Sequence, residues 1–357
     1  MGVRVPGRRK GRGAVSDPPN RYASQHGEAE DDGWNLLDAL AQERPCTEWI
    51  PLRVSRLIAR NRSPDVPFDR SVNPYRGCEH GCIYCFARPT HAWLDLSPGL
   101  DFETRIHYKP DAPELLREEL AAPGYAPSPL ALGINTDAWQ PIERRLRITR
   151  GLLEVLGEAR HPVSIVTKSA LIERDLDLLA EMAQRRLVQV AVSVTTLDPE
   201  LARRMEPRAA APHRRLATVR RLHEAGIPVG VLVAPVIPFL NDGELEKILA
   251  VCRESGAEFA GYVLLRLPHE VAPLFAEWLA VHYPERKARI LGRMRDCHGG
   301  RLYEASFGHR MQGSGPYAAL IARRFERAVE RLGYRDPPSL EVAAFRPPGT
   351  GGQLPLF

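Results

Sequence analysis

The sequence predicts an α/β fold: a partial (βα)6 TIM-like barrel with disordered N- and C-terminal tails and a helical C-terminal extension. The first observation is that, after residue 128, short β-rich runs alternate with amphipathic helical stretches. The second is that runs such as Val229–Ile237 are apolar on both faces, which is typical of parallel strands covered by helices. Repeated βα units form either an open doubly wound sheet or a barrel. We find about six units, too few for a closed eight-unit barrel.

The N-terminal part of the chain divides into a tail and a short extension. Residues 1–33 are rich in Gly, Arg, Pro, Asp and Glu and poor in large apolar side chains, so they bury too little surface to offset their ordering entropy. We expect a disordered tail, basic first and acidic later. Its basic part is compatible with nucleic-acid contact and equally with a solvated tail that has no fixed partner. Residues 34–67 form an N-terminal extension that begins with a short helix over 34–41.

The barrel is expected over residues 68–267. Its predicted strands lie near Val72–Tyr75 and at Leu130–Asn135, Val163–Thr167, Leu187–Thr195, Val229–Ile237 and Phe259–Leu265. The predicted helices between them are Glu143–Leu156, Ile172–Ala183, Arg214–Ala225 and Glu244–Ser255. Residues 268–334 are Arg-rich and are expected to form the helical extension, and the Pro- and Gly-rich residues 335–357 to form a flexible tail. In parallel α/β folds the functional groups gather at the carboxyl ends of the strands.

Net charge and composition exclude few classes of protein or partner. A net charge of +5 over 357 residues is compatible with an anionic partner but does not require one. No stretch has the length of apolar residues needed to span a bilayer, and no apolar region follows the basic N-terminus as in a secretory signal peptide. We therefore expect a cytoplasmic protein without a membrane partner. In that reducing compartment, clustered thiols indicate metal binding or catalysis rather than disulfides.

Three cysteines carry the strongest chemical signal. Cys78, Cys82 and Cys85 follow a C-x3-C-x2-C spacing within a loop of eight residues. Gly77 and Gly81 allow the backbone to turn tightly, so the three thiolates can point at one centre. Thiolates are the usual ligands of iron–sulfur clusters, and a cubane has four irons. Three ligands leave one iron open for a substrate or cofactor.

Other interpretations of the cysteines remain open at this stage. Zinc bound by three Cys and one His is possible, with His80 or His91 as the fourth ligand. A structural cluster with a distant fourth cysteine would use Cys46, Cys252 or Cys297. Chance proximity of three core cysteines fits poorly with a loop rich in Gly and polar residues.

The cysteine spacing resembles the radical SAM superfamily, and Tyr84, just before the last cysteine, strengthens the match. The resemblance covers roughly residues 68–300. It implies that a [4Fe–4S] cluster binds the amino and carboxylate groups of S-adenosylmethionine (SAM) through its open iron. An electron from the cluster then cleaves a C–S bond and yields a 5′-deoxyadenosyl radical. The resemblance also implies a partial βα barrel, which agrees with the strand pattern found independently.

Within the superfamily, the chain resembles bacterial proteins described as DNA-repair-photolyase-like and related to spore photoproduct lyase. The segments that carry this likeness are Asn73–Phe86, Asn135–Glu143, Thr167–Ser169, Ser193–Thr196, Glu206–Arg208 and Ala234–Ile237. The likeness to this subfamily is close, whereas the likeness to the lyase itself is remote outside the cysteine loop.

Polar residues at the predicted strand ends are candidates for binding SAM. Asn135, Thr136 and Asp137 close one strand, Lys168 closes the next, and Ser193 lies near the end of the third. Carboxylates and amides suit the ammonium and diol of SAM, whereas cations suit its carboxylate. By resemblance, Lys168 and Ser193 match SAM-contacting positions, Arg215 lies near the SAM carboxylate and Tyr84 lies against the adenine. The full set of candidates is Tyr84, Asn135, Thr136, Asp137, Gln140, Glu143, Lys168, Ser193 and Arg215. For the residues that follow strands, helix capping is the alternative role.

The remaining cysteines separate this chain from the lyase. The lyase places a hydrogen-donating cysteine on the strand after the cluster loop, but the corresponding stretch Leu130–Asn135 contains none. This difference argues against the spore photoproduct reaction. Cys297 is a candidate for a catalytic thiol on the substrate side, whereas Cys252 and Cys46 are expected to be structural.

The last five residues resemble a docking peptide. Gln353, Leu354, Leu356 and Phe357 match the Q-L-x-L-F pattern by which bacterial repair and replication proteins bind the sliding clamp. A flexible tether could present the three apolar side chains to a groove while the glutamine adds directional hydrogen bonds. A tail with chance apolar residues, or one that folds back on the domain, is the alternative.

These observations together predict a radical SAM enzyme that acts on DNA in the manner of a repair lyase, with the sliding clamp as a partner and a flavodoxin, ferredoxin or reductase as electron donor. A base inside a duplex is out of reach, so such an enzyme requires base flipping or a single strand. The first alternative is a radical SAM enzyme that modifies RNA, a protein or a small molecule, because fold and cofactor do not determine the substrate. The second is a non-enzymatic, metal-stabilised protein that binds nucleic acid or the clamp.

Overall fold

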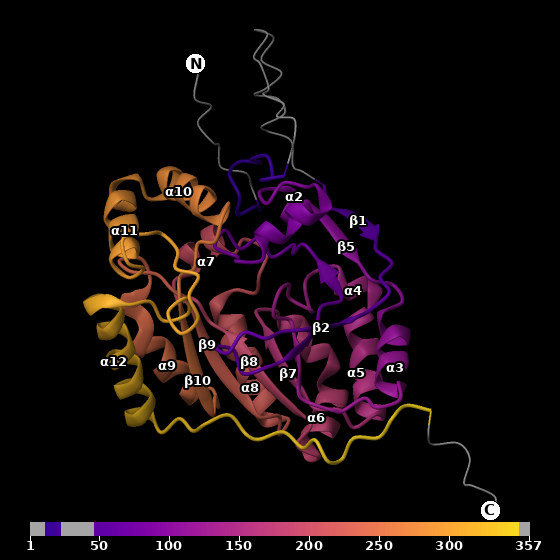
Figure 1. The fold of residues 1–357 in the computed structure, drawn as a ribbon. Helices are drawn as coiled ribbons and strands as arrows, with labels where there is room; N and C mark the ends of the chain where they lie inside the picture. The colour runs from indigo at the N-terminus through magenta and orange to yellow at the C-terminus, as the bar shows by residue number, and fades with distance from the viewer. Residues whose placement is uncertain (1–10, 23–45, 350–357) are drawn as a thin grey trace, which may run out of the picture.

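A seven-stranded sheet organises the molecule (Figure 1). The structure is a computed structural model and describes residues 11–22 and 46–349. The strand order is β10-β9-β8-β7-β6-β3-β2, in which all neighbours are parallel except the edge pair β2–β3. The strands are β2 (Ile58–Arg60), β3 (Arg70–Val72), β6 (Leu130–Leu132), β7 (Val163–Thr167), β8 (Val188–Ser193), β9 (Val229–Val236) and β10 (Phe259–Leu264).

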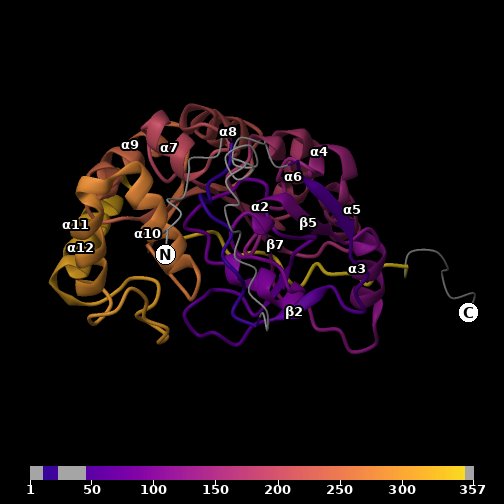
Figure 2. The same cartoon turned by 90° about the horizontal axis from the view of Figure 1, so that it is seen from above.

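Six parallel strands confirm the predicted partial (βα)6 architecture. Within the described residues the outermost strands, β10 and β2, do not pair with each other, so the sheet stays open. Seen from above, the helices curve around the outer side of the strands (Figure 2). These outer helices are α3 (Ala112–Ala121), α5 (Ile148–Glu158), α6 (Leu176–Gln184), α8 (Pro212–Glu224) and α9 (Leu245–Glu254).

The core lies between the sheet and these helices. Val188, Val190 and Val192 of β8 are at most 1% exposed, as the apolar pattern of a covered strand requires. The predicted helix over 143–156 is divided, because Arg147 adopts a left-handed conformation with φ 54°. A short α4 (Glu143–Leu146) therefore precedes α5, and the Glu143 carboxylate accepts a hydrogen bond from the Thr149 amide at the start of α5, at 3.0 Å.

A smaller layer covers the carboxyl ends of the strands. It contains a three-stranded sheet of order β1-β5-β4 and several short helices. Its elements are β1 (Glu48–Pro51), β4 (Tyr75–Arg76), the 3-10 helix η1 (Arg88–Leu94), α2 (Asp101–Thr104) and β5 (Arg105–Tyr108). The loop that carries the three clustered cysteines connects β4 to η1 and so belongs to this layer, whose α2 and β5 lie above the sheet in Figure 1.

The C-terminal extension is helical, as predicted. It consists of α10 (Val271–His282), α11 (Pro284–Asp296) and α12 (Gly315–Leu332), and α12 packs against α9 and β10. The remaining short elements are the 3-10 helices η2 (Ala170–Asp175) and η3 (Asp242–Glu244) and the helix α7 (Pro199–Met205). None of the described helices combines the length and apolar content needed to cross a bilayer.

Parts of both predicted tails have defined structure. Residues 11–22, predicted as part of a disordered tail, lie over the cysteine loop, where Ala14 and Val15 are at most 4% exposed. Residues 335–349, predicted as a flexible tail, run along the amino ends of the strands (Figure 1). Composition alone missed both segments because much of their anchoring comes from backbone hydrogen bonds. The predicted helix over 34–41 and the docking peptide over 353–357 lie outside the described residues.

Candidate active site at the carboxyl ends of the strands

The structure brings the three thiols of the cysteine loop together. Cys78 and Cys82 are each 7% exposed, and Cys85 is half-buried and packs against the hydrophobic cluster that contains Cys78. Burial, followed by the proximity of Cys82, raises the pKa of the Cys78 thiol well above its ordinary value. Burial also raises the pKa of Cys82 and Cys85. Thiols in such surroundings become thiolates when a cation binds them, because metal ligation requires the deprotonated form.

Two glycines allow the loop to approach its neighbours closely. Gly77 has φ 80°, and a Cβ atom there would lie 2.9 Å from the imidazole Cε1 of His91. Gly81 has φ 67°, and a Cβ atom there would lie 2.7 Å from the Glu103 carboxylate. Both residues combine a backbone conformation that favours glycine with a lack of space for any side chain.

Arg88 holds the backbone of the cysteine loop in place through hydrogen bonds. This arginine is fully buried, and it donates to the carbonyl oxygens of Cys82 at 2.9 Å and Gly81 at 3.2 Å. Its charge is matched by the fully buried Glu103 carboxylate at 2.5 Å. Glu103 also accepts the backbone N–H groups of Gly13 and Ala14, at 3.0 and 2.8 Å. The ion pair therefore joins the cysteine loop to residues 11–22.

The donor set fits an iron–sulfur cluster better than a single metal ion. Within residues 11–22 and 46–349, no three His, Cys, Asp or Glu side chains are close enough to share one ion. A cubane sets its ligands further apart, because each thiolate binds a different iron. The imidazoles considered as zinc ligands have other neighbours: His91 Nε2 lies 3.1 Å from the Arg105 carbonyl, and His80 Nδ1 lies 3.5 Å from the Asp137 carboxylate.

A buried polar network lies next to the loop, below Tyr84. The Tyr84 hydroxyl donates to the Glu206 carboxylate, which also accepts from Thr195 Oγ1 at 2.8 Å. The Lys168 ammonium lies 3.3 Å from the same carboxylate and 5.5 Å from the centre of the Tyr84 ring. Lys168 also donates to Ser193 Oγ at 2.8 Å. Side chains from the ends of β7 and β8 thus meet the cysteine loop, as predicted.

Glu206 was not among the candidate SAM-binding residues predicted from the sequence. It is 3% exposed, and burial raises its pKa even though the Arg215 guanidinium acts in the opposite direction. Arg215, predicted near the SAM carboxylate, instead pairs with Glu206 and donates to the backbone carbonyls of Ser193 and Ala210, at 3.0 and 2.7 Å. The segment Glu206–Arg208 stood out only by resemblance, because the contacts of Glu206 come from distant parts of the chain.

Among the candidate residues, Lys168 carries the charge that is least compensated by partners within the protein. Burial lowers the pKa of Lys168 to about 8, although the neighbouring Cys82 acts in the opposite direction. The Glu206 carboxylate, which forms an ion pair with Lys168, is already paired with Arg215. An anionic group placed beside Lys168 would therefore be stabilised by a desolvated cation.

Four other candidate residues form hydrogen bonds that hold the backbone around the site. Asp137 accepts from Thr167 Oγ1 at 2.8 Å and from the Lys168 amide at 2.7 Å, so it joins the ends of β6 and β7. Gln140 accepts from the Glu79 amide and donates to the Gly77 carbonyl, at 2.9 and 3.1 Å. Thr136 donates to the Tyr75 carbonyl, and Glu143 binds Tyr75, Thr149 and Arg174. In contrast, Asn135 is exposed at the end of β6.

The structure places some of the cysteines outside the loop differently from the prediction. Cys297 is fully buried in the main core, and burial raises its pKa to about 11, so the structure corrects its assignment as a substrate-side thiol. Cys252 is a buried core residue, as expected. Cys46, which was expected to be structural, is exposed.

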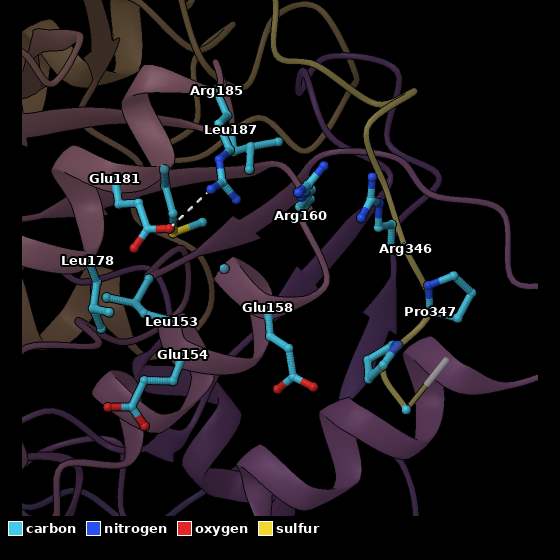
Figure 3. A pocket seen from close by; sticks show the side chains of 14 residues that line it. Leu153, Glu154, Glu158, Arg160, Leu178, Glu181, Arg185, Leu187, Arg346 and Pro347 are labelled. Carbon is cyan, nitrogen blue, oxygen red and sulfur yellow. Dashed lines mark ion pairs between the residues drawn. The ribbon is translucent and has the colours of Figure 1, made fainter. Parts of the chain in front are cut away.

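A cavity of about 490 Å³ lies away from this site (Figure 3). It is formed by α5, α6 and the C-terminal residues Arg346–Gly349. Figure 3 shows the ion pair between Arg185 and Glu181 on its wall, at 3.4 Å. None of the candidate residues lines this cavity.

Comparison with known proteins agrees with this geometry. Residues 72–252 match the model of the radical SAM superfamily. An uncharacterised protein of Mycobacterium tuberculosis is 42% identical over 236 residues, covering 65% of this chain and 69% of the relative. Another, from Methanocaldococcus jannaschii, is 25% identical over 238 residues, covering 67% of this chain and 85% of the relative.

Solved structures with a similar fold include variants of spore photoproduct lyase. One matches with a TM-score of 0.57 and 16% identity over 80% of both chains. Another, which holds S-adenosylmethionine and a dinucleoside spore photoproduct, matches with a TM-score of 0.58 and 15% identity over the same shares. At such identities the likeness is one of fold. The family match goes further, because it covers half of the chain: the chain belongs to the radical SAM superfamily, whose cofactors, a [4Fe–4S] cluster and SAM, are also those of this protein.

Proposed function

We propose that this radical SAM enzyme acts on DNA in the manner of a repair lyase, with Cys78, Cys82 and Cys85 as the ligands of its cluster. The observation that supports the site is the proximity of the buried Cys78 and Cys82 and the half-buried Cys85 to a desolvated cation, Lys168, at the carboxyl ends of β7 and β8. When bound, the cluster and SAM together supply the reductive C–S cleavage of the superfamily. The electron that it requires must come from a redox partner.

In the proposed mechanism the protein groups bind and orient SAM. Lys168 would hold the SAM carboxylate, and Ser193, which accepts a hydrogen bond from Lys168, would bind the ammonium. Tyr84, whose hydroxyl donates to Glu206, would contact the adenine. Glu206 and Arg215 act as positioning residues, because their buried charges satisfy each other. The exposed amide of Asn135 is available to the ribose hydroxyls.

A nucleic-acid substrate is supported by exposed aromatic side chains near the site. Trp93 is 72% exposed on η1, directly after the cysteine loop, and Tyr22 is 56% exposed with its ring centre 5.5 Å from that of Trp93. Trp49 of β1 is 38% exposed, and the Arg145 guanidinium lies 4.7 Å from its ring centre. Exposed aromatic rings paired with arginine provide surfaces on which bases stack.

The structural likeness to spore photoproduct lyase adds support for a lesion in DNA, but not for the same reaction route. The strand β6 (Leu130–Leu132) lacks a cysteine, and Cys297 is buried in the core. We therefore propose a lesion other than the spore photoproduct, or a different hydrogen donor. Clamp docking by residues 353–357 concerns residues outside the described part and stays a prediction.

The experiment starts from anaerobically reconstituted protein, reduced with dithionite in the presence of SAM and ultraviolet-irradiated DNA. We expect iron binding, formation of 5′-deoxyadenosine and loss of a photoproduct by chromatography. A triple replacement of Cys78, Cys82 and Cys85 by Ala should abolish all three, whereas the exposed Cys46→Ala should change none. Formation of 5′-deoxyadenosine with RNA or peptide, but not with irradiated or intact DNA, would refute the DNA proposal and leave the enzyme class intact.

A variant at Lys168 tests the proposed SAM site separately. Lys168→Ala should weaken SAM binding about tenfold or more, because a desolvated charge-assisted contact is lost. Its iron content should match that of the wild type. The exposed Lys247→Ala on α9 is the matched control. Equal SAM affinity in equilibrium dialysis for Lys168→Ala and the control would remove Lys168 from the site.

A further inference from the structure

Arg266 occupies a distinctive place beside the cysteine loop. It lies two residues beyond the last residue of β10, at the carboxyl end of an edge strand. Its guanidinium carbon is 5.1 Å from the ring centre of Phe86 and 5.9 Å from that of Tyr303. Phe86 directly follows Cys85 and is 38% exposed. The guanidinium therefore lies against an aromatic ring at the rim of the proposed active site.

The charge of Arg266 has no carboxylate partner among the described residues. Its guanidinium contacts Met311 Sδ, at 3.3 Å from Nη1, and the Tyr303 hydroxyl, at 3.5 Å from Nη2. A thioether is a weak acceptor, and 3.5 Å is long for a hydrogen bond. The buried Nε atom of Arg266 has no hydrogen-bond partner within the described residues.

Other arginines near the site are placed differently. The buried Arg88 and Arg215 pair with Glu103 and Glu206, respectively. A cation near a protein surface without such a partner is costly unless an anion or water satisfies it. A planar guanidinium that stacks on a ring keeps its nitrogen edge available for a bidentate contact with phosphate or carboxylate.

The wall next to Arg266 favours an anionic polymer. The Leu264 amide donates to the Met311 carbonyl at 2.8 Å, which fixes the loop 298–314 to the end of β10. In the same loop, Arg310 pairs with Asp65 between β2 and β3, so this wall links the two open edges of the sheet. The loop 298–314 itself carries Arg301 and Arg310 against the single carboxylate of Glu304, a small excess of positive charge.

We propose that Arg266 and Phe86 form a binding site for a nucleic-acid strand, in which Arg266 holds a backbone phosphate and Phe86 stacks against a neighbouring base. This site rests on the proposed function, because it names where the DNA substrate is held. A phosphate matches the fork of the guanidinium, and the exposed ring offers a surface that tolerates any base. The position directly after Cys85 sets this contact next to the cluster ligands.

The test uses the anaerobically reconstituted protein and a fluorescein-labelled single-stranded thymidine dodecamer. Fluorescence anisotropy is measured over a salt series from roughly 50 to 200 mM. We expect Arg266→Gln to bind about tenfold more weakly and to lower the log–log salt slope by about one, as loss of one phosphate contact requires. Phe86→Leu should weaken binding with an unchanged slope, because stacking releases no counterion.

Two further variants make the result specific. Arg266→Lys keeps the charge but loses the planar fork, so its salt slope should match the wild type while its affinity falls. Arg220→Gln removes an exposed arginine from the outer helix α8 and should bind like the wild type. Iron content and thermal unfolding of each variant verify that the cluster and the fold are retained.

The outcomes separate this inference from the proposed function. If the wild type binds the oligonucleotide and Arg266→Gln binds with the same affinity and slope as Arg220→Gln, the site at Arg266 is refuted while a DNA substrate survives. If inorganic phosphate at millimolar concentration displaces the oligonucleotide equally from wild type and Arg266→Gln, the phosphate is held elsewhere. If the wild type binds no oligonucleotide, both proposals fail.

Discussion

Residues 11–22 and residues 335–349 are two segments of similar composition that are held in different ways. The first, which we call the strap, lies on the cysteine loop and is anchored by buried charge: Gly13 and Ala14 donate to Glu103, which is paired with Arg88. The second runs along the amino ends of the strands and is anchored by scattered backbone hydrogen bonds and by Phe345, whose ring centre lies 5.5 Å from those of Tyr125 and His161.

The comparison indicates that the two ends of the sheet have different roles. At the carboxyl ends, buried ion pairs position the backbone of a cysteine loop. At the amino ends, packing and backbone hydrogen bonds close the apolar core. We therefore expect damage to the strap to affect the cluster and stability together, and damage to the C-terminal segment to affect stability alone.

The largest effect is expected for Glu103→Gln. This change removes the charge that matches the fully buried Arg88 and weakens the acceptor for Gly13 and Ala14, so unfolding should become easier by about 3–5 kcal/mol. Iron retained per protein after desalting should fall markedly. Chemical denaturation and iron analysis measure both effects. Glu48→Gln, which removes an exposed carboxylate, is the control. Normal iron content in Glu103→Gln would show that the strap is only structural.

A smaller effect is expected for Gly13→Ala in the strap. A Cβ atom at Gly13 would lie 1.9 Å from the Gly81 carbonyl oxygen, so the backbone of the strap or of the loop must move. Overpacking of this kind typically costs about 1–3 kcal/mol. We expect the visible absorbance of the reconstituted cluster to decay faster in air than in the wild type. Gly292→Ala on α11, where a Cβ atom meets nothing within 4 Å, is the control. An unchanged rate of decay would mean that the strap does not shield the cluster.

Elements with strong local signals were predictable from the sequence. The bounds of β7 match the prediction and β9 ends one residue earlier, because both runs are rich in β-branched residues and follow a Pro. In contrast, β6 ends at Leu132, since Gly133 turns with φ 83° against the Val166 carbonyl. The division of a helix at Arg147 was not predicted either, because the left-handed conformation of this residue, with φ 54°, leaves no mark in the helical pattern of the sequence.

Part of the site was also predictable, because some of its residues have strong local signals in the sequence. The cysteine loop, Lys168 and Ser193 follow from spacing and from their positions at strand ends, and the structure brings them together. The role of Glu206 depends on Tyr84 and Lys168, which are distant in sequence, and that of Glu103 depends on Arg88 and the strap. A buried carboxylate whose partners lie on other elements of the fold leaves no local pattern. Composition also misjudged the strap, because its contacts are polar ones to residues far away in the sequence, made by the amides of Gly13 and Ala14 and by the side chains of Asp17 and Asn20.

At the amino ends of the strands, Phe345→Ala should act on stability alone. The ring of Phe345 is half-buried between Tyr125 and His161, so its loss should cost about 1–2 kcal/mol, less than truncation of a fully buried ring. Iron content and formation of 5′-deoxyadenosine should stay at wild-type values. Leu320→Ala, at a 42% exposed side chain of α12, serves as the comparison in chemical denaturation. Loss of iron in Phe345→Ala would break the proposed division between the two ends of the sheet.

The smallest effect is expected for Glu341→Gln in the same segment. Its carboxylate lies 2.7 Å from the Arg186 guanidinium, whose side chain is 70% exposed, so solvent screens the pair and its contribution is at most about 0.5 kcal/mol. The backbone hydrogen bond from the Glu341 amide to the Arg186 carbonyl, at 2.8 Å, survives the substitution. Denaturation midpoints of Glu341→Gln and wild type should therefore coincide at both low and high salt. A destabilisation as large as that of Phe345→Ala, and lost at high salt, would show that charge anchors the amino ends as it anchors the strap.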